Sequence, residues 1–291
     1  MSNQKTKAIL FVLSSAFCFA LMNAFVRLSG DLPSIQKSFF RNAIALLFAA
    51  AVLMKNGGSF RWKKGNLPLL LVRAGFGTVG ILCNFYAVDH LLLSDASMLN
   101  KLSPFAAIVF SFFFLHEKVN AVQISAICAA FVGALCIIKP SFDLVEFLPA
   151  VIGFLGGVCA GAAYTAVRAL SQRQEHGPFI VFFFSGFSCL SVVPWMVTHY
   201  VPMSGFQLLM LLGAGLAAAG GQFSITAAYA NAPAREISVF DYSQVVFAAV
   251  LGFFLFDQRP DLLSLLGYCI ICGVSVAMFL YNNRKVERVY R

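Results

Sequence analysis

Residues 94–118 read SDASMLNKLSPFAAIVFSFFFLHEK, and this stretch decides the fold class. It is almost wholly apolar after Lys101, a cation that lies about two turns inside what reads as a membrane helix. Residues 234–258, AREISVFDYSQVVFAAVLGFFLFDQ, repeat the pattern, and Asp241 stands in the place of Lys101. A cation and an anion at matched positions of two buried helices predict where the function lies.

The composition excludes a soluble domain. Of the 291 residues, 60% are hydrophobic and 11% are charged, whereas soluble domains have about 25% charged residues. Apolar runs of about 20 residues are what a bilayer crossing requires. We therefore predict an all-α integral membrane protein with ten transmembrane helices. Their expected ranges are 8–28, 35–54, 67–88, 92–116, 120–138, 148–170, 178–199, 205–229, 233–256 and 261–281.

The basic residues predict the orientation. With the amino terminus inside, thirteen Lys and Arg residues fall in or beside cytoplasmic segments and four on the opposite side. Cytoplasmic loops of membrane proteins carry such an excess, so we expect both termini in the cytoplasm and the chain in the cytoplasmic (plasma) membrane. The net charge of +9 sits in short clusters between apolar runs. This pattern argues against nucleic acid and for contact with membrane lipids.

An internal repeat predicts the architecture. At an offset of 140, Phe113-Phe114-Leu115 pairs with Phe253-Phe254-Leu255. An offset of that length contains five crossings, and an odd number of crossings inverts the second copy in the membrane. We expect two inverted five-helix repeats, residues 1–142 and 143–291, around a central cavity, as in many secondary transporters.

The chain resembles the drug/metabolite transporter superfamily, in particular its EamA-type members with ten spans. The residues that carry the likeness are SFFRN at 38–42, LSPFAAIVFSFFFLHEK at 102–118, FDYSQVVFAAVLGFFLFDQ at 240–258 and LLGYCIICG at 265–273. The second half departs from the pattern with Gln244 where the first has Pro104, and with Asp257-Gln258 where the family often has Gly-Glu. The end of the ninth span is therefore expected to be held differently from that of the fourth.

The resemblance implies a transporter of small organic metabolites and not an enzyme. In such proteins the first, third, fourth, sixth, eighth and ninth spans surround the cavity, while the fifth and tenth lie to one side and are candidates for homodimer contacts. The FDY sequence at 240–242 is similar to the branch that contains S-adenosylmethionine carriers. Substrate identity, transport direction and oligomeric state stay open.

Lys101 and Asp241 are the central candidates for substrate binding. Each lies eight to ten residues into its expected span, near the bilayer midplane. A charge at the centre of a membrane helix costs about 2.5–3.5 kcal/mol by insertion scales, so each must face protein or water. A purely structural pair is the alternative, although buried pairs stabilise less than apolar packing does. Lys101 suits a carboxylate or phosphate, and Asp241 suits an amine or sulfonium, which favours an amino-acid-like or zwitterionic metabolite.

Other polar residues within the spans complete the predicted site. The further substrate-binding candidates are Tyr242, Asn23, Asn84, Tyr164, Gln222 and Ser224. For each, an interhelical hydrogen bond is the alternative role. The gating or structural candidates are Arg41, Glu117 and Asp257. Arg73 and Arg168 are expected to extend toward the cytoplasmic helix ends.

No cofactor or metal is predicted. The eight cysteines fall within apolar runs and the four histidines at span edges, without metal-ligand spacing. Asp241 is a candidate proton carrier, so proton-coupled transport and uncoupled exchange both stay open. The rival functions are a lipid or lipid-linked headgroup flippase, a non-transporting membrane scaffold and an intramembrane enzyme. The last would need a nucleophile–base pair that the sequence lacks.

Overall fold

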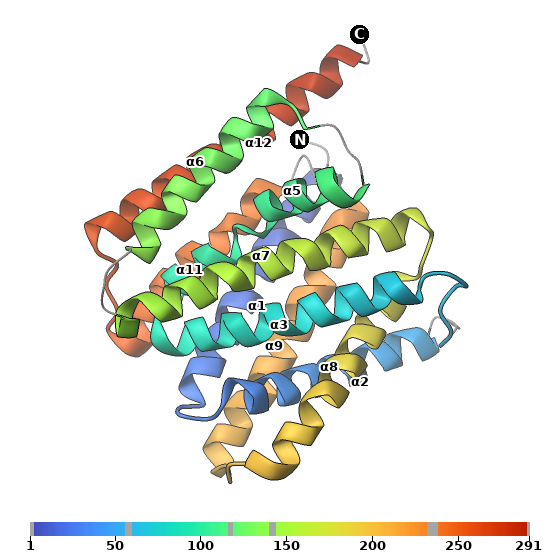
Figure 1. Cartoon of the computed structure of the whole chain (residues 1–291), viewed down its shortest axis with the longest axis vertical. Coiled ribbons are helices and arrows are strands. Elements are labelled where there is room, and N and C mark those ends of the chain that lie inside the picture. The colour runs from blue at the N-terminus through green and yellow to red at the C-terminus, as the bar shows by residue number, and fades with distance from the viewer. Residues whose placement is uncertain (1–2, 56–59, 116–118, 140–143, 232–237, 290–291) are drawn as a thin grey trace.

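The computed structural model is a helical bundle and describes residues 3–55, 60–115, 119–139, 144–231 and 238–289. Figure 1 shows the chain, with every described element a helix. The elements are α1 (Asn3–Leu28), α2 (Ser34–Lys55), α3 (Leu67–His90), α4 (Leu93–Asn100), α5 (Ser103–Leu115), α6 (Ala121–Ile138), α7 (Leu144–Gln172), α8 (Gly177–His199), α9 (Gly205–Asn231), the 3₁₀ helix η1 (Ser238–Tyr242), α11 (Ser243–Phe256) and α12 (Leu262–Val289).

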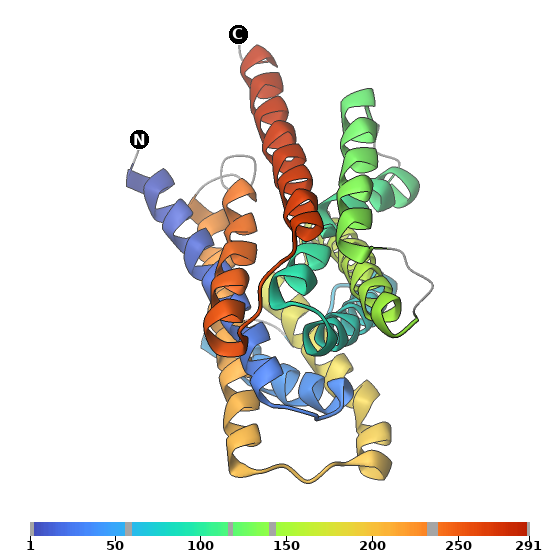
Figure 2. The same cartoon turned by 90° about the vertical axis from the view of Figure 1, so that its left-hand side faces the viewer.

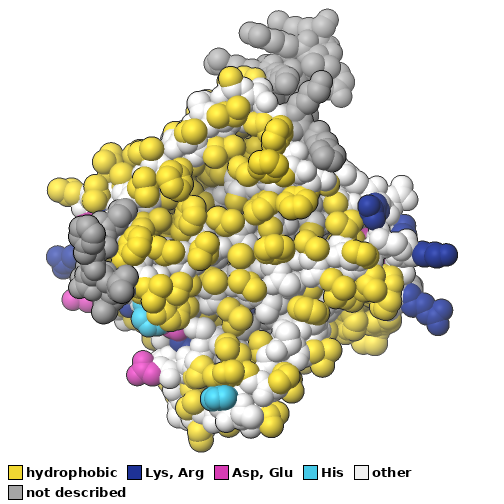
Figure 3. All heavy atoms as spheres, viewed as in Figure 1, with side chains coloured by type: hydrophobic (Ala, Val, Ile, Leu, Met, Phe, Trp, Pro, Cys, Tyr) yellow, Lys and Arg dark blue, Asp and Glu magenta, His cyan; other side chains and the backbone are white. Residues whose placement is uncertain are grey.

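The predicted all-helical membrane fold is confirmed. Among the described residues, nine spans are long and apolar enough to cross a membrane, and Phe240–Phe256 adds a shorter apolar helix. Large apolar side chains cover the outside of the bundle, among them Phe114, Leu190, Val197, Phe254 and Leu262. In Figure 3 apolar side chains fill the middle of the visible face, and Lys and Arg gather at its edges. A water-exposed surface would not carry such a belt, whereas lipid favours it.

The helix pairing follows the repeat. α1 packs against α9, and its counterpart in the second half, α7, packs against α3. In the same way α1 contacts α11, and α7 contacts α5. The pairs α2 with α8 and α6 with α12 join equivalent helices of the two halves. Each of these helix pairs corresponds to another pair, or to itself, when the first and second halves are exchanged. The fold is therefore a two-fold arrangement of five-helix units.

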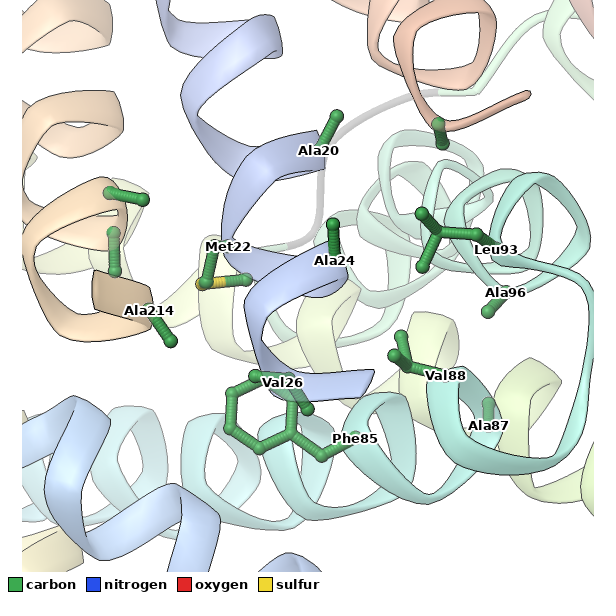
Figure 4. Close-up of a cluster of buried hydrophobic side chains, with 13 residues drawn as sticks. Ala20, Met22, Ala24, Val26, Phe85, Ala87, Val88, Leu93, Ala96 and Ala214 are labelled. Carbon is green, nitrogen blue, oxygen red and sulfur yellow. The ribbon is translucent and has the colours of Figure 1, made fainter. Parts of the chain in front are cut away.

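Small side chains allow the core helices to approach closely. Figure 4 shows Ala20 and Ala24 of α1 facing the α3–α4 region, where Phe85, Val88 and Leu93 fill the space between them. All five residues are buried. Lipid provides no hydrophobic drive for helix association, so close packing of small residues is what holds such helices together.

The fourth span is broken, which the sequence analysis did not anticipate. Range 92–116 was expected as one helix, but α4 ends at Asn100 and α5 begins at Ser103. Pro104 has no N–H and fits the first turn of α5. In the second half the matched position, Asp241, lies in the 3₁₀ turn that precedes α11. Lys101 therefore stands at the break between α4 and α5, and Asp241 stands in the 3₁₀ turn at the start of α11.

α6 and α12 form a pair at one side of the molecule, as expected for the fifth and tenth spans. Figures 1 and 2 show the two helices side by side in both views. A Cβ built on Gly267 would lie 2.7 Å from the Gly133 carbonyl oxygen, and one on Gly133 would lie 2.8 Å from Ile271. The helices touch through their backbones at this point, so neither glycine can be replaced without separating them.

We expect Gly267→Ala to lower the thermal unfolding midpoint, because the added methyl meets a backbone carbonyl that has no room to move. Overpacking of this kind costs about 1–3 kcal/mol. The matched control is Gly273→Ala on the same helix, where a Cβ meets nothing within 4 Å. It should leave the midpoint unchanged or raise it, because alanine favours helix. Equal effects of the two changes would contradict the close backbone contact.

Candidate functional site

The two predicted charges meet. Lys101 Nζ donates to Asp241 Oδ2 at 2.5 Å, across 140 residues of sequence. The Lys101 side chain is 10% exposed and the Asp241 side chain 29%. The pair is therefore neutral as a unit, while its carboxylate keeps a face open to a ligand or to water.

Tyr242 secures the helix break that carries Lys101. In a continuous helix Phe105 N–H would donate to the carbonyl of Lys101, but here it donates to Leu102. The carbonyl freed in this way accepts a hydrogen bond of 3.2 Å from the hydroxyl of Tyr242. An unpaired carbonyl is costly inside a membrane, so this bond from the second half stabilises the break in the first.

Asn23 and Asn84 lie together in a chain of hydrogen bonds that leads toward Lys101. Asn84 Nδ2 donates to Asn23 Oδ1 at 3.3 Å, and Asn23 Nδ2 donates to Ser97 Oγ at 3.4 Å. Both amides are buried. Ser97 lies one turn before Lys101 and accepts its backbone N–H. Three helices, α1, α3 and α4, thus share one polar chain beside the charged pair.

The remaining candidates lie elsewhere. Ser224 of α9 meets Ser14 of α1, with 3.4 Å between the hydroxyl oxygens. Gln222 is exposed on α9. Tyr164 of α7 is 54% exposed and lines a cavity of about 230 Å³ with Thr165 and other residues of α5, α6 and α7. In the described part of the chain neither Tyr164 nor Ser224 is hydrogen-bonded to Lys101 or Asp241, and their part in substrate binding stays a prediction.

The gating or structural candidates lie in different parts of the molecule. Arg41 Nη1 donates to Asn42 Oδ1 at 2.6 Å within α2. Asp257 ends α11 in the left-handed conformation, with φ 51°, and is exposed. The following residue Gln258 ties the end of α11 to the first half, because its Oε1 accepts the N–H of Leu93 at 2.9 Å. Glu117 falls outside the described residues.

Two features were missed by the sequence analysis. The Tyr268 hydroxyl of α12 donates to Asp95 Oδ1 at 2.6 Å and lies 2.8 Å from Ser94 Oγ, whose hydrogen it can accept. This explains how α4 can be buried with an acid in its first turn. The expectation that Arg73 extends toward the nearer, cytoplasmic end of α3 is wrong. Its guanidinium carbon lies 4.1 Å from the centre of the Phe184 ring.

One end of the bundle is closed by polar ties; we call it the Asp89 end, defined by Arg27, Lys37 and Asp89. The fully buried Lys37 side chain donates to Asp89 Oδ1 at 2.6 Å. Arg27 Nη1 donates to the carbonyls of Val88 and Leu91. Arg27 and Asp89 also line a cavity of about 560 Å³ at this end. The helices α1, α2 and α3 are thereby fastened together on this side.

An exposed ion pair lies outside the spans on the same side. Lys139 Nζ lies 2.8 Å from Asp261 Oδ1. The Lys139 hydrogen bond, together with the Ser264 N–H, lowers the pKa of Asp261 to about 2. A lowered pKa means that the pair contributes above the ordinary carboxyl pKa and is lost only as the pH falls toward 2. It therefore stays ionised throughout the physiological range.

Metal ligation is not indicated in the described part of the chain, where no three His, Cys, Asp or Glu side chains gather closely enough to hold an ion. The cysteines are free thiols within or beside the helices. Cys269 and Cys272 are one turn apart on α12 without a further ligand from His, Asp or Glu.

Comparison with known proteins gives consistent matches. Residues 6–139 and 148–280 each match the model of the EamA-like transporter family. The pseudopaline exporter CntI of Pseudomonas aeruginosa is 35% identical over 276 residues, which cover 94% of this chain and 96% of that protein. The riboflavin transporter of Vibrio cholerae is 26% identical over 287 residues, covering 96% of this chain and 94% of that one.

One solved crystal structure is similar along almost the whole length. The two structures have a TM-score of 0.66 at 16% sequence identity, and the match covers 96% of this chain and 98% of the other chain. At that identity the likeness concerns the fold alone.

A double-mutant cycle tests whether the charges form one unit. Lys101→Met and Asp241→Leu should each lower the thermal unfolding midpoint, because each leaves a charge without its partner. The cost should stay below the about 3–5 kcal/mol of a fully buried pair, since Asp241 is partly exposed. The double variant should unfold closer to the wild type than either single variant does. Additive losses would show that the two side chains act independently.

Proposed function

Because the chain belongs to the EamA-like transporter family, we propose that it moves a small organic metabolite across the cytoplasmic membrane by alternating access. The names of its relatives are those of transporters and not of enzymes. The single observation that carries the proposal is the ion pair between Lys101 and Asp241, placed at the break between α4 and α5 and at the 3₁₀ turn that precedes α11. Interrupted helices that meet at the interface of two repeats are where secondary transporters bind their substrates.

The pair explains how a substrate would be recognised. Lys101 and Asp241 neutralise each other when the site is empty, so neither charge is left alone in the membrane. A substrate that carries both an anionic and a cationic group replaces each partner in turn. Zwitterionic or amino-acid-like metabolites, with S-adenosylmethionine-like compounds among them, have this chemistry. Tyr242 and the chain of Asn23, Asn84 and Ser97 would fix the geometry around the pair.

The hydrogen bonds at one end of the bundle support alternating access. At the Asp89 end, Gln258 of the second half holds the start of α4, and Gln207 Nε2 of α9 donates to the carbonyl of Ser29 at 3.0 Å. These bonds join core helices of opposite halves. With the Lys and Arg excess placed inside, the Asp89 end faces outward and both termini lie in the cytoplasm. The described conformation is then the one closed to the outside.

Asp241 is also the candidate for proton coupling. Its carboxylate is partly exposed, and its hydrogen-bond partner among the described residues is the cation of Lys101, which a substrate would displace. Protonation would release Lys101 and leave the site with a net positive charge. The more exposed carboxylate of Asp261 has no such role, because its pKa is lowered to about 2.

Purified protein in liposomes should take up or exchange at least one zwitterionic metabolite. We expect Lys101→Ala and Asp241→Asn each to abolish transport, because each removes one half of the recognition. A radiolabelled panel of amino acids, sulfonium compounds and headgroup-like phosphoamines, tested with and without a pH gradient, measures both substrate class and coupling. The control is Asp261→Asn, which removes an exposed carboxylate outside the spans. Transport that survives both site variants would contradict the proposed site, and movement of labelled lipid alone would favour a flippase.

The hydrogen bonds that close the Asp89 end can be tested separately. Gln258→Leu removes the acceptor for the Leu93 N–H, and an unsatisfied buried donor costs about 1–3 kcal/mol. The closed form should therefore lose population. With Ser97→Cys introduced into a variant without native cysteines, a membrane-impermeant thiol reagent added outside should label Gln258→Leu faster than the parent. Asp261→Asn should leave the rate unchanged, and an equal rate in all three would contradict the closure.

A further inference from the structure

A second polar cluster lies away from the charged pair and consists of two arginines from two helices. Arg73 of α3 stacks over Phe184 of α8. Asn42, which accepts from Arg41 of α2, donates to Ser188 one turn further along α8, so both guanidinium groups lie against the same stretch of that helix. Like charges held together inside a membrane need an explanation, because each of them alone is costly there.

Arg41 is held in place by its neighbour. The Asn42 carbonyl oxygen accepts from Arg41 Nη1 at 2.6 Å. The amide nitrogen of Asn42 donates to Ser38 Oγ at 3.1 Å and to Ser188 Oγ at 2.8 Å. Asn42 is therefore fixed by α2 and α8 and orients the guanidinium. Arg41 Nε is buried and has no hydrogen-bond partner.

Arg73 is directed into the bundle by two features. Its guanidinium stacks over Phe184, 4.1 Å from the ring centre. A Cβ at Gly77, one turn further along α3, would overlap Arg73 Nη1. The missing side chain at Gly77 thus makes room for an arginine that points toward the middle of the membrane. Arg73 Nε is likewise buried without a hydrogen-bond partner.

No described carboxylate neutralises this cluster. The ion pairs in the described part of the chain use Lys37, Lys101 and Lys139 as their cations. Asp95 is bound by Tyr268, and Glu175 accepts from Asn66 and from the N–H of Lys63. The two guanidinium groups therefore keep N–H donors that no acid of the described chain accepts.

We propose that Arg41 and Arg73 form a binding subsite for an oxyanion group, a carboxylate or phosphate, of the transported metabolite. The planar guanidinium donates two parallel hydrogen bonds to such groups, and an anion between two arginines removes their repulsion. The inference rests on the proposed transport function and extends it.

The subsite narrows the substrate class. A metabolite that binds at both the charged pair and the arginines would carry a zwitterionic part at Lys101 and Asp241 and an additional acidic group at the arginines. Its net charge would then be negative.

Thermal unfolding of the purified full-length protein in inorganic phosphate tests the subsite. At millimolar phosphate and constant ionic strength, the wild type should show a saturable rise of the midpoint. Arg41→Gln and Arg73→Gln should each raise the half-saturating concentration at least about tenfold, because each removes a charge-assisted donor pair. Arg173→Gln, which changes an exposed arginine bound to the Gly65 carbonyl, should behave as the wild type. An identical phosphate response in all four proteins would overturn the subsite and indicate a general salt effect.

Chemical modification provides a readout that needs no variant. Phenylglyoxal should modify peptides containing Arg41 and Arg73 more slowly when phosphate is present, while the rate at Arg173 stays the same. Equal rates with and without phosphate would contradict binding. This measurement applies even where Arg41→Gln does not fold. Arg73→Lys keeps the positive charge but loses the two parallel hydrogen bonds of the guanidinium, so it should show an intermediate phosphate affinity.

The source of the oxyanion is distinguished by the membrane. In nanodiscs of neutral phosphatidylcholine, phosphate or succinate should stabilise the protein through the arginines. Stabilisation that appears only with anionic phosphatidylglycerol would assign the cluster to a lipid headgroup and overturn the substrate subsite. If only the subsite proposal is wrong, phosphate has no effect, while Lys101→Ala and Asp241→Asn still abolish transport. If only the transport proposal is wrong, phosphate still stabilises the protein through the arginines, but no metabolite is taken up.

Discussion

The absence of water in the bilayer core is the constraint on which this structure depends. Every polar group that leaves a regular helix there must find its partner within the protein. The break frees the carbonyl of Lys101 and introduces its cation, and the second half supplies a hydroxyl from Tyr242 and a carboxylate from Asp241 to meet them. The broken helices are therefore stable only as a pair, and the site exists only where the two halves touch.

Much of this arrangement could be predicted from the sequence, since charges and repeats are visible in it. The meeting of Lys101 and Asp241 followed from their matched positions, because residues that a two-fold operation exchanges can touch when they lie near its axis. Tyr164 lies instead at a cavity between α5, α6 and α7, and the repeat alone does not place it. The repeat thus located the pair, and the part of the other candidates in substrate binding stays a prediction.

The helix breaks and the arginine cluster were beyond the reach of hydropathy. Range 92–116 is apolar whether or not it is interrupted, and Pro104 alone was no sign of a break, because membrane helices tolerate proline. Arg73 lies near a helix end by sequence, and its inward direction depends on the empty position at Gly77 and on Phe184 of another helix. Such directions are set by tertiary contacts that no local pattern contains.

The exchange of partners between the halves has a consequence for how the protein is made. α1 is synthesised long before α9, α3 before α7, and α6 before α12, yet these are the pairs that pack together. The first five spans therefore leave the translocon without the helices that will cover their packing faces. Assembly of the core has to wait until most of the chain has been inserted, and during that interval lipid, or another membrane protein, must shelter the buried Lys101.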